Sequence, residues 1–413
     1  MKRTLIYATI ITLLASFLIF FQSSEIPKGL ANDEVDFIHL ALDLEGQPYQ
    51  PYTPAATGHT TLYFYVILFF FKTLGLSQFA LRFASAASGI IAALLFYLIC
   101  HEAFGKKSFK VALPFVKKFE FHTAFLVAVI FLTMRWYFSF ARFSFEASFL
   151  LMFELGALYL AILFRKSQSL ILLVLAALAT GLAYNSYTPG RLFIILMVGL
   201  IFYVSKNRKL HLSVFFGIFA LLIAPLTLYF TQNQDVRIEQ QLYLKNTGLT
   251  ILEKVSFFLQ NLWKNTRMFF GDGDPNGRHN YPFKSALNPI LYSALGVGLV
   301  HFFRTKRTFF QNLFAAYFLI GLLPTLLTYP HENPNMLRTY TMLPAIAYFI
   351  GQGFMWIYSQ VKKDTKKAEL VGLLIVFLVA VSVVYEVRSY FVFQKLVYIQ
   401  AFDLMNVFEN LAK

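Results

Sequence analysis

Two adjacent carboxylates, Asp33 and Glu34, lie a short distance beyond the first long apolar run of the chain, Leu5 to Phe21. Carboxylates in such a position can act as general base or acid. The run before them is long enough to cross a bilayer, which puts the pair at a membrane surface. Acidic residues also stabilise the first turn of a helix. The sequence therefore makes Asp33 and Glu34 candidate catalytic residues, with helix capping as the alternative.

Further polar clusters interrupt the apolar sequence, each next to the end of an apolar run. They combine carboxylates with arginine, histidine, asparagine and tyrosine, which are residue types that hold phosphates and move protons. The candidates are Arg142 and Glu146; Tyr187 and Arg191; Asp274, Arg278, His279 and Asn280; and His331, Asn333, Arg338 and Tyr340. Arg142 and Arg191 also suit snorkelling at an interface. Arg142 and Glu146, four residues apart, also suit an ion pair on one helix surface.

The composition is that of a multi-span membrane protein. Of the 413 residues 58% are hydrophobic, 18% aromatic and only 14% charged, which is too apolar for a soluble domain. In such a chain the formal net charge of +15 reports the orientation of the spans, and we expect no nucleic-acid partner. The single cysteine, Cys100, allows no internal disulfide and leaves the redox compartment undetermined.

The positive-inside rule orients the spans. Lys2 and Arg3 precede the first apolar run, so we expect a cytoplasmic amino terminus and an extracytoplasmic Asp33. The segment 61–74 is apolar but short. If it lies in the interface, the lysines of segment 106–118 fall in the cytoplasm, as the rule requires. This predicts an all-α polytopic protein with about eleven transmembrane helices and an extracytoplasmic carboxyl terminus.

The expected spans are 5–21, 79–101, 123–140, 149–164, 170–184, 191–204, 212–230, 289–303, 309–327, 342–358 and 370–385. The apolar spacing of 33–44 predicts an interfacial helix in the first outer loop, 23–78. A second long outer loop covers 231–288. We expect one transmembrane domain, 1–388, followed by a short extracytoplasmic tail, 389–413.

This topology sends nearly every polar cluster to one side, although the clusters were not used to build it. Bundled spans would bring several clusters around a single cavity at the outer leaflet. A water-soluble substrate would not need a site at that depth, whereas a lipid-linked phosphate would reach it directly from the membrane.

In these motifs and their order, the chain resembles the GT-C integral-membrane glycosyltransferases, in particular the branch with protein O-mannosyltransferases and the lipid A aminoarabinose transferase. The shared features are Asp33-Glu34, the R-x-x-x-E that ends at Glu146, the Y-x-P-x-R that starts at Tyr187, the GD…RHN that ends at Asn280 and the H-E-N…R-x-Y-x-x-L-P that starts at His331. The resemblance covers essentially the whole chain. Each motif is short, and it is their order and spacing that make the resemblance specific.

The resemblance implies transfer of a sugar from a polyprenyl-phosphate donor to a hydroxyl of a lipid, protein or glycan acceptor, with inversion. The active site would face the extracytoplasmic side of the plasma (inner) membrane. By resemblance, Asp33 is the general base, and Arg338, with Arg278 and His279, holds the donor phosphate. Relatives often carry Lys-Pro-Pro before the second interfacial helix. This chain reads TPAATGHTT there, and His59 is the nearest substitute.

No cofactor is required by this interpretation, but some relatives use a divalent cation, for which Asp33, Glu146 and Asp274 are the candidate ligands. The GDGDPNG segment that contains Asp274 lacks the ligand spacing of an EF-hand, and we interpret it mainly as a turn. Glu154 falls in the middle of a span, where it needs a hydrogen bond within the bundle or a cavity. The alternative function is a transporter or flippase of a lipid-linked or anionic substrate. Such a protein should carry ionisable residues near the midplane of the membrane.

Overall fold

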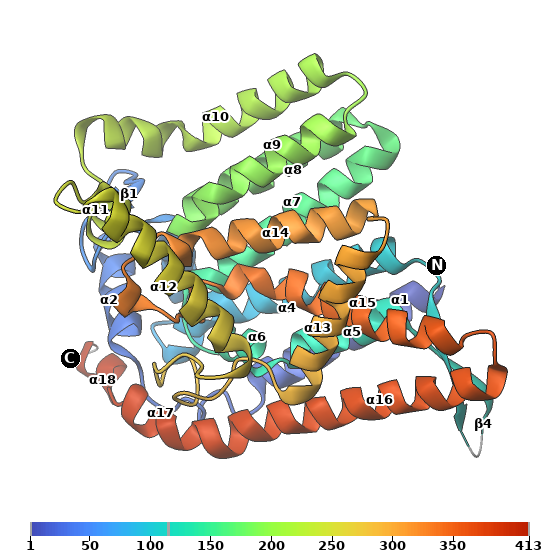
Figure 1. Cartoon of the computed structure of the whole chain (residues 1–413). Coiled ribbons are helices and arrows are strands. Elements are labelled where there is room, and N and C mark those ends of the chain that lie inside the picture. The colour runs from blue at the N-terminus through green and yellow to red at the C-terminus, as the bar shows by residue number, and fades with distance from the viewer. Residues whose placement is uncertain (1, 114–115, 412–413) are drawn as a thin grey trace.

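The computed structural model describes residues 2–113 and 116–411. The side chains of residues 112–118, which include Lys117 and Lys118, lie outside the described part of the structure. In the described part most of the chain is helical, and most long helices run between the same two ends of the molecule (Figure 1). One end, on the left of Figure 1, carries the carboxyl terminus. The other end carries the amino terminus.

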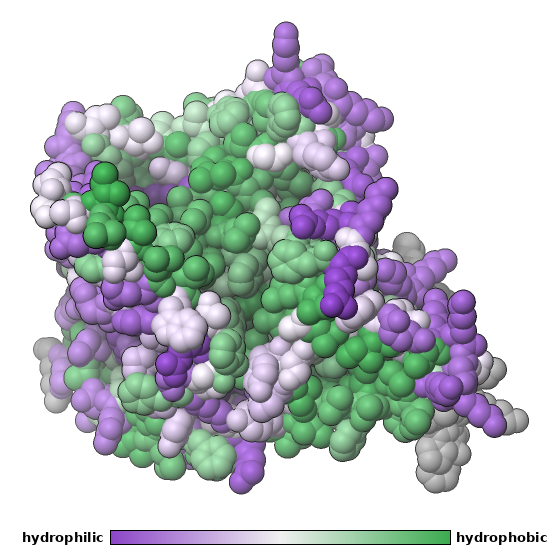
Figure 2. Space-filling model, in the orientation of Figure 1, coloured by the Kyte–Doolittle hydropathy of each residue, from purple (hydrophilic) through white to green (hydrophobic). Residues whose placement is uncertain are grey.

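The long helices are α1 (Lys2–Phe20), α4 (Gln78–Phe104), α7 (Glu146–Ser167), α8 (Leu170–Ser186), α9 (Phe193–Val204), α10 (Arg208–Gln232), α13 (Pro289–Arg304), α14 (Phe309–Leu326), α15 (Leu343–Val361) and α16 (Thr365–Arg388). Six helices of the described chain are long and apolar enough to cross a bilayer, and several shorter ones are also apolar. Figure 2 shows a broad apolar surface between two more polar ends. The protein is thus an all-α, multi-pass membrane protein.

The remaining helices are α2 (Asn32–Asp43), α3 (Leu62–Leu74), α5 (Thr123–Thr133), α6 (Arg135–Phe140), η1 (Thr188–Leu192), α11 (Val236–Gln241), η2 (Tyr243–Lys245), α12 (Ile251–Phe270), η3 (Pro330–Glu332), η4 (Tyr340–Met342), the π-helical turn η5 (Ser389–Gln394), α17 (Lys395–Ala401) and α18 (Val407–Leu411). Two antiparallel strand pairs complete the fold. They are β1 (Tyr52–Thr53) with β2 (His59–Thr60), and β3 (Ser108–Leu113) with β4 (Val116–His122).

The expected span 123–140 is not one continuous helix, because it breaks at Met134, between α5 and α6. Arg135 is buried at the break, where its backbone N–H donates to Glu386 Oε2 (3.1 Å) and its guanidinium donates to Asn280. A buried arginine needs such partners. The chain therefore turns at this point to reach them, which hydropathy does not register.

The lysine-rich segment 106–118 was expected only as a loop, but much of it forms the β3–β4 hairpin. Phe109 and Val111 of β3 are buried and Lys110 between them is exposed, which is the alternation of a strand with one covered face. The hairpin packs against α16, at the end of the molecule that carries the amino terminus (Figure 1).

The last expected span, 370–385, is only part of a longer helical run. α16 continues through η5 and α17 to Ala401 without a loop at residue 388. Beyond α17, the backbone N–H of Leu404 donates to the carbonyl of Leu30 (3.2 Å) and the N–H of Leu30 donates back (2.9 Å). The segment after α16 is thereby tied to the first outer loop.

The two loops that we expect on the outer side, 23–78 and 231–288, build one end of the molecule. The first contains α2, the β1–β2 pair and α3, so a helix is confirmed at 33–44, and its interfacial position stays a prediction. The second contains α11 and the amphipathic helix α12. Asn261 fixes the polar side of α12, because its Nδ2 donates to the carbonyls of Leu326 (3.1 Å) and Thr328 (2.6 Å). Leu252 and Trp263 of α12 are exposed, as expected of a helix in a membrane interface.

Candidate active site

A polar cavity of about 280 Å³ lies at the end of the molecule that carries α2 and α11. Segments far apart in the sequence form its wall. Of the candidate residues it is lined by Asp33, His59, Tyr187, Arg278, His279 and Arg338, and it is also lined by Asp36, Arg237, Glu332 and Asn335. The cavity thus combines carboxylates, histidines and three arginines in one place.

Asp33 stands in the first turn of α2, and its side chain is 39% exposed toward the cavity. Its Oδ2 accepts a hydrogen bond from Nη1 of Arg278, which belongs to the long outer loop. Asp33 and Arg278 therefore form an ion pair on the cavity wall. Both groups stay accessible to a ligand that could replace either partner.

Glu34 points elsewhere, although it is the next residue. It is 1% exposed, and its carboxylate accepts from Arg82 through Nε and Nη2 (both 2.9 Å). It also accepts from the backbone N–H groups of Ser144 (2.9 Å) and Ala31 (3.3 Å), so it caps α2. Glu34 does not line the cavity. Its contacts join α2 to α4 and fix the direction in which Asp33 points.

His59 and Arg237 meet in front of a buried carboxylate, Glu146. His59 Nδ1 lies 3.0 Å from Glu146 Oε1, and His59 Nε2 lies 3.2 Å from Arg237 Nη2 and 2.9 Å from the carbonyl of Ala56. Arg237 Nη1 is 3.7 Å from Glu146 Oε2. Glu146 does not itself line the cavity; it supplies a negative charge behind the two cavity groups and orients them.

The expected pairing of Arg142 with Glu146 is wrong, because α7 begins only at Glu146 and Arg142 lies in the turn before it. Arg142 is buried, so the interfacial alternative also fails. Its guanidinium donates to the carbonyls of Ile19 (2.8 Å), Phe21 (2.8 Å) and Ile26 (2.9 Å). Carbonyls at the end of α1 have no partner within the helix. The guanidinium of Arg142 supplies the missing hydrogen-bond donors. Arg142 does not line the cavity.

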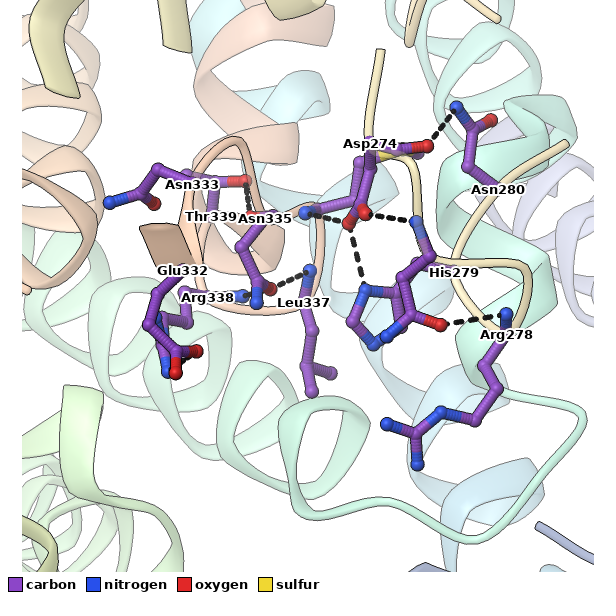
Figure 3. A network of polar contacts seen from close by, with 12 residues as sticks. Asp274, Arg278, His279, Asn280, Glu332, Asn333, Asn335, Leu337, Arg338 and Thr339 are labelled. Carbon is purple, nitrogen blue, oxygen red and sulfur yellow. Dashed lines mark hydrogen bonds and ion pairs between the residues drawn. The ribbon is translucent and has the colours of Figure 1, made fainter. Parts of the chain in front are cut away.

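Asp274 connects two loops at the cavity (Figure 3). Its Oδ2 lies 2.8 Å from His279 Nδ1 and accepts from the backbone N–H of Met336 (2.7 Å). This contact leaves Nε2 as the ring nitrogen of His279 that a ligand in the cavity can reach. Asn280 is buried beneath the loop, where its Nδ2 donates to the carbonyl of Asp274 (3.1 Å). Asp274 and Asn280 therefore shape the loop and do not line the cavity.

Arg338 enters the cavity beside Glu332, as Figure 3 shows. Its Nη2 donates to Glu332 Oε2 (2.8 Å), and its Nη1 lies 3.4 Å from Thr328 Oγ1. Asn335 Oδ1 accepts from the N–H groups of Leu337 (3.0 Å) and Arg338 (3.1 Å), which holds the turn that presents Arg338. Arg338 and Asp33 thus line the same cavity.

The remaining candidates of this segment lie outside the cavity. The side chain of His331 is 74% exposed and faces Glu332 (3.5 Å). Asn333 is buried, and its Nδ2 donates to Asn261 Oδ1 (2.9 Å). Tyr340 is buried and donates to the carbonyl of Tyr137 (3.0 Å). Asn333 and Tyr340 have structural contacts that support the turn before and after Arg338.

A smaller, mainly apolar hollow of about 130 Å³ adjoins the polar cavity. The two share Tyr187, Arg237, Gln241 and Arg338. The hollow also contains Arg191, which pairs with Asp235. Arg191 Nε and Nη2 and Arg237 Nε are buried and have no partner among the described residues. Buried N–H groups without acceptors are unfavourable, and these lie beside the junction of the two spaces.

The two walls of the hollow, formed by η1 and the end of α14, continue along α9 and α14 toward the middle of the molecule. An apolar cleft of about 440 Å³ lies between α9 and α14, beginning about one helical turn beyond the hollow. Leu196 and Leu200 of α9 face Leu313 and Ala316 of α14 across this cleft. Burial raises the pKa of Tyr187 at the junction, so its hydroxyl stays protonated and can donate. An elongated apolar ligand with an anionic head fits this sequence of spaces.

Arg237 is the functional candidate that the sequence analysis missed. It lies in α11, in a segment without any of the motifs, and the positive-inside rule gives no weight to a single outer arginine. Arg237 lies close to Glu146, which is 91 positions earlier in the sequence (237 minus 146). The sequence carries no signal for such a contact.

The three candidate cation ligands do not form a set. Asp33 pairs with Arg278, Glu146 contacts His59, and Asp274 binds His279 and a backbone N–H. In the ranges 2–113 and 116–411, no three histidine, cysteine or acidic side chains are grouped as metal ligands. These residues do not fit a divalent cation as arranged, and we derive no step through one.

The fold and the cavity define a multi-pass α-helical membrane protein with a polar site at one end of its bundle. Neither a protein-family model nor the sequence of a curated protein matches the chain. Solved structures of ArnT from Cupriavidus metallidurans do match. The structure bound to undecaprenyl phosphate has a TM-score of 0.53 and 13% identity, over 96% of this chain and 76% of ArnT. The apo structure has a TM-score of 0.50 and 13% identity, over 95% and 76%.

The chain therefore has the fold of ArnT, which is a GT-C fold. The expected GT-C fold is confirmed over almost the whole chain. At this level of identity the likeness concerns the fold, and the chemistry of the site must be argued from the residues that line it.

Proposed function

We propose that this protein is a membrane glycosyltransferase that moves a sugar from a polyprenyl-phosphate donor to an acceptor hydroxyl. One observation carries the proposal. Asp33, Arg237 and Arg338 line one polar cavity, and this cavity joins an apolar hollow at the two arginines. A proton acceptor, cations for a phosphate and a path for a lipid tail thus occur together. The fold shared with an ArnT structure bound to undecaprenyl phosphate agrees with this choice of donor.

The donor phosphate would bind at the junction of the two spaces. Arg237 and Arg338 border both, and Arg191 adds buried N–H groups that have no partner among the described residues. Guanidinium groups bind phosphate oxygens in bidentate geometry. The prenyl chain would follow the hollow into the apolar cleft between α9 and α14. The sugar would then extend into the polar cavity, toward Asp33.

In the reaction, the carboxylate of Asp33 accepts the proton of the acceptor hydroxyl. The hydroxyl oxygen forms the new bond to the anomeric carbon on the face opposite the phosphate. The bond from that carbon to the phosphate oxygen breaks, and polyprenyl phosphate leaves with the electron pair, so the configuration inverts. Negative charge on the phosphate grows in the transition state. The fixed arginines therefore stabilise the transition state more than the bound donor.

Two ion pairs prepare the site for the donor. Arg278 pairs with Asp33, and Arg338 pairs with Glu332. In each pair the carboxylate occupies the arginine until the bound donor takes its place. A carboxylate bound by arginine is a poorer proton acceptor than a free one. When the donor phosphate draws Arg278 away, Asp33 is released to act as base. This exchange would couple donor binding to activation of the base.

The positive-inside rule supports the orientation that we propose. The cavity faces the extracytoplasmic side of the plasma membrane, the amino terminus is cytoplasmic, and about eleven helices span the bilayer. Glu154, the ionisable residue at mid-span, accepts a hydrogen bond from Tyr317 (2.6 Å) and lines none of the cavities described above. It forms a hydrogen bond within the bundle, and it gives no support to a transport function.

Incubation of the purified protein with a panel of polyprenyl-phosphate sugars tests the proposal. We expect release of polyprenyl phosphate from at least one donor, slowly to water and faster when an acceptor is added. Movement of the lipid across liposome bilayers without cleavage of any donor would instead indicate a flippase and would overturn the proposal.

A further inference from the structure

A second hollow, of about 640 Å³, lies at the end of the molecule opposite the candidate active site. The end of α4 and the β3–β4 hairpin form one side of it. The end of α15 and the start of α16 form the other. Lys106, Lys107, Lys110 and Lys362 line it, together with Tyr358 and Thr365. We call these six residues the lysine pocket.

No carboxylate of the described residues lies within ion-pair distance of the four lysines. The ion pairs in this region involve other residues, since Lys166 pairs with Glu102 and Lys367 with Asp364. Glu120 of the hairpin accepts from Ser108 Oγ (3.2 Å). Segment 112–118, whose side chains are not described, contains no acidic residue in the sequence. The lysine pocket therefore has a positive potential that the protein itself does not neutralise.

A buried hydroxyl in the lysine pocket also lacks an acceptor. Tyr358 is 2% exposed, and its Oη accepts from the backbone N–H of Lys110 (3.1 Å). The hydroxyl hydrogen has no acceptor among the residues that the structure describes. Thr365 lies in the first turn of α16, whose N–H groups are already capped by the carboxylate of Asp364, so the donors of the pocket are the lysines and Tyr358. The donors of the lysine pocket suit phosphate oxygens.

The positive-inside rule explains why lysines occur at this end of the molecule. It does not explain why four of them surround one hollow, which depends on the hairpin packing against α16. Leu370, Leu374 and Phe377 of α16 are exposed within the next turns of the helix, on the face opposite Thr365 and Ala368, which line the hollow. Figure 2 shows the polar residues of this end bordering the apolar surface. A phosphate with attached acyl chains matches this arrangement better than a free phosphate.

We propose that the lysine pocket binds the phosphate headgroup of an acidic phospholipid in the leaflet opposite the candidate active site. The four lysines neutralise the phosphate, and Tyr358 donates a hydrogen bond to it. The acyl chains extend into the adjoining bilayer, beside the apolar surface that borders this end of the molecule. This site is independent of the proposed sugar transfer and would exist whatever reaction the protein catalyses.

The test measures lipid binding to the full-length protein. Native mass spectrometry and thermal unfolding in detergent would follow the titration of phosphatidylglycerol, phosphatidylcholine or inorganic phosphate. We expect phosphatidylglycerol to bind and to raise the unfolding temperature. The triple variant Lys106→Gln, Lys107→Gln, Lys110→Gln should bind it about 100-fold more weakly, at roughly fivefold per lysine.

The matched control removes three lysines from other loops at the same end, with Lys206→Gln, Lys209→Gln and Lys306→Gln; all three are exposed. Tyr358→Phe removes only a hydroxyl and keeps the lysines, so it separates binding from folding, with an expected loss of about fivefold. An equal loss of binding in the control triple would overturn the proposal, because the attraction would then be diffuse. Inorganic phosphate that bound as well as the lipid would overturn the lipid as ligand.

Discussion

Asp33 and Arg278 form an ion pair across 245 residues of sequence, on the wall of the polar cavity. Asp33 belongs to α2 in the first outer loop, and Arg278 belongs to the irregular part of the second. The contact brings the proposed base and a proposed phosphate ligand together before any donor is present. The first two predictions depend on this pair.

Asp33→Asn should lower sugar transfer by about 100-fold or more, because the amide keeps the shape of the side chain but cannot accept the proton. Donor affinity should change little, since Asp33 does not contact the phosphate in our proposal. Measured rates of transfer at saturating donor test this. Asp43→Asn, an exposed change on the same helix, is the control. Full activity in Asp33→Asn would exclude this residue as base.

Arg278→Gln removes the partner of Asp33 and one phosphate ligand together. We expect the KM for the donor to rise by about tenfold, the value of one charge-assisted hydrogen bond. Transfer rates measured over a range of donor concentrations give this KM. An unchanged donor KM would contradict the exchange of partners.

Arg338→Ala should weaken donor use far more than acceptor use. Arg338 borders both the polar cavity and the apolar hollow, and its loss removes about 1.5–3 kcal/mol of charge-assisted hydrogen bonding to the phosphate. KM values for donor and acceptor, determined separately, provide the test. Arg388→Ala, at the exposed arginine that ends α16, should leave both values unchanged. Equal effects of Arg338→Ala on donor and acceptor would argue against a phosphate role.

Arg142→Gln should destabilise the protein rather than impair its chemistry. The change leaves the carbonyls of Ile19, Phe21 and Ile26 without their donor in the interior, at a cost of about 3 kcal/mol or more. A lower unfolding temperature in detergent, with transfer per folded molecule close to that of the unchanged protein, is the expected result. A stable but inactive variant would place Arg142 in the reaction instead.

Gly58→Ala should disturb the approach of His59 to the cavity. Gly58 has φ +85, where an L residue other than glycine is strained by about 1–2 kcal/mol. A Cβ at this position would also lie 2.1 Å from Tyr52 Oη. We expect reduced stability and reduced transfer together. Gly46→Ala, at another positive φ but with open space around it, controls for backbone strain alone.

Hydropathy and lysine placement in the sequence predicted the class of the protein well. Most expected spans lie within helices, and α2 follows the first span at the expected place, because burial in a membrane imposes long apolar runs. Hydropathy did not predict the break within 123–140, where Arg135 reaches Glu386 and Asn280. The β3–β4 hairpin also escaped the analysis, since a short alternating segment among lysines carries a weak signal.

The sequence alone determined that the chain is a membrane bundle with its polar clusters toward one end, since the spacing of apolar runs and basic residues is written along the chain. Only the tertiary structure decided which of those residues meet. Asp33 lines the cavity while Glu34, one position later, is sealed against Arg82, and Arg237 enters the site from a segment without a motif. Neighbours in a helix point about 100° apart, and distant segments meet only through packing.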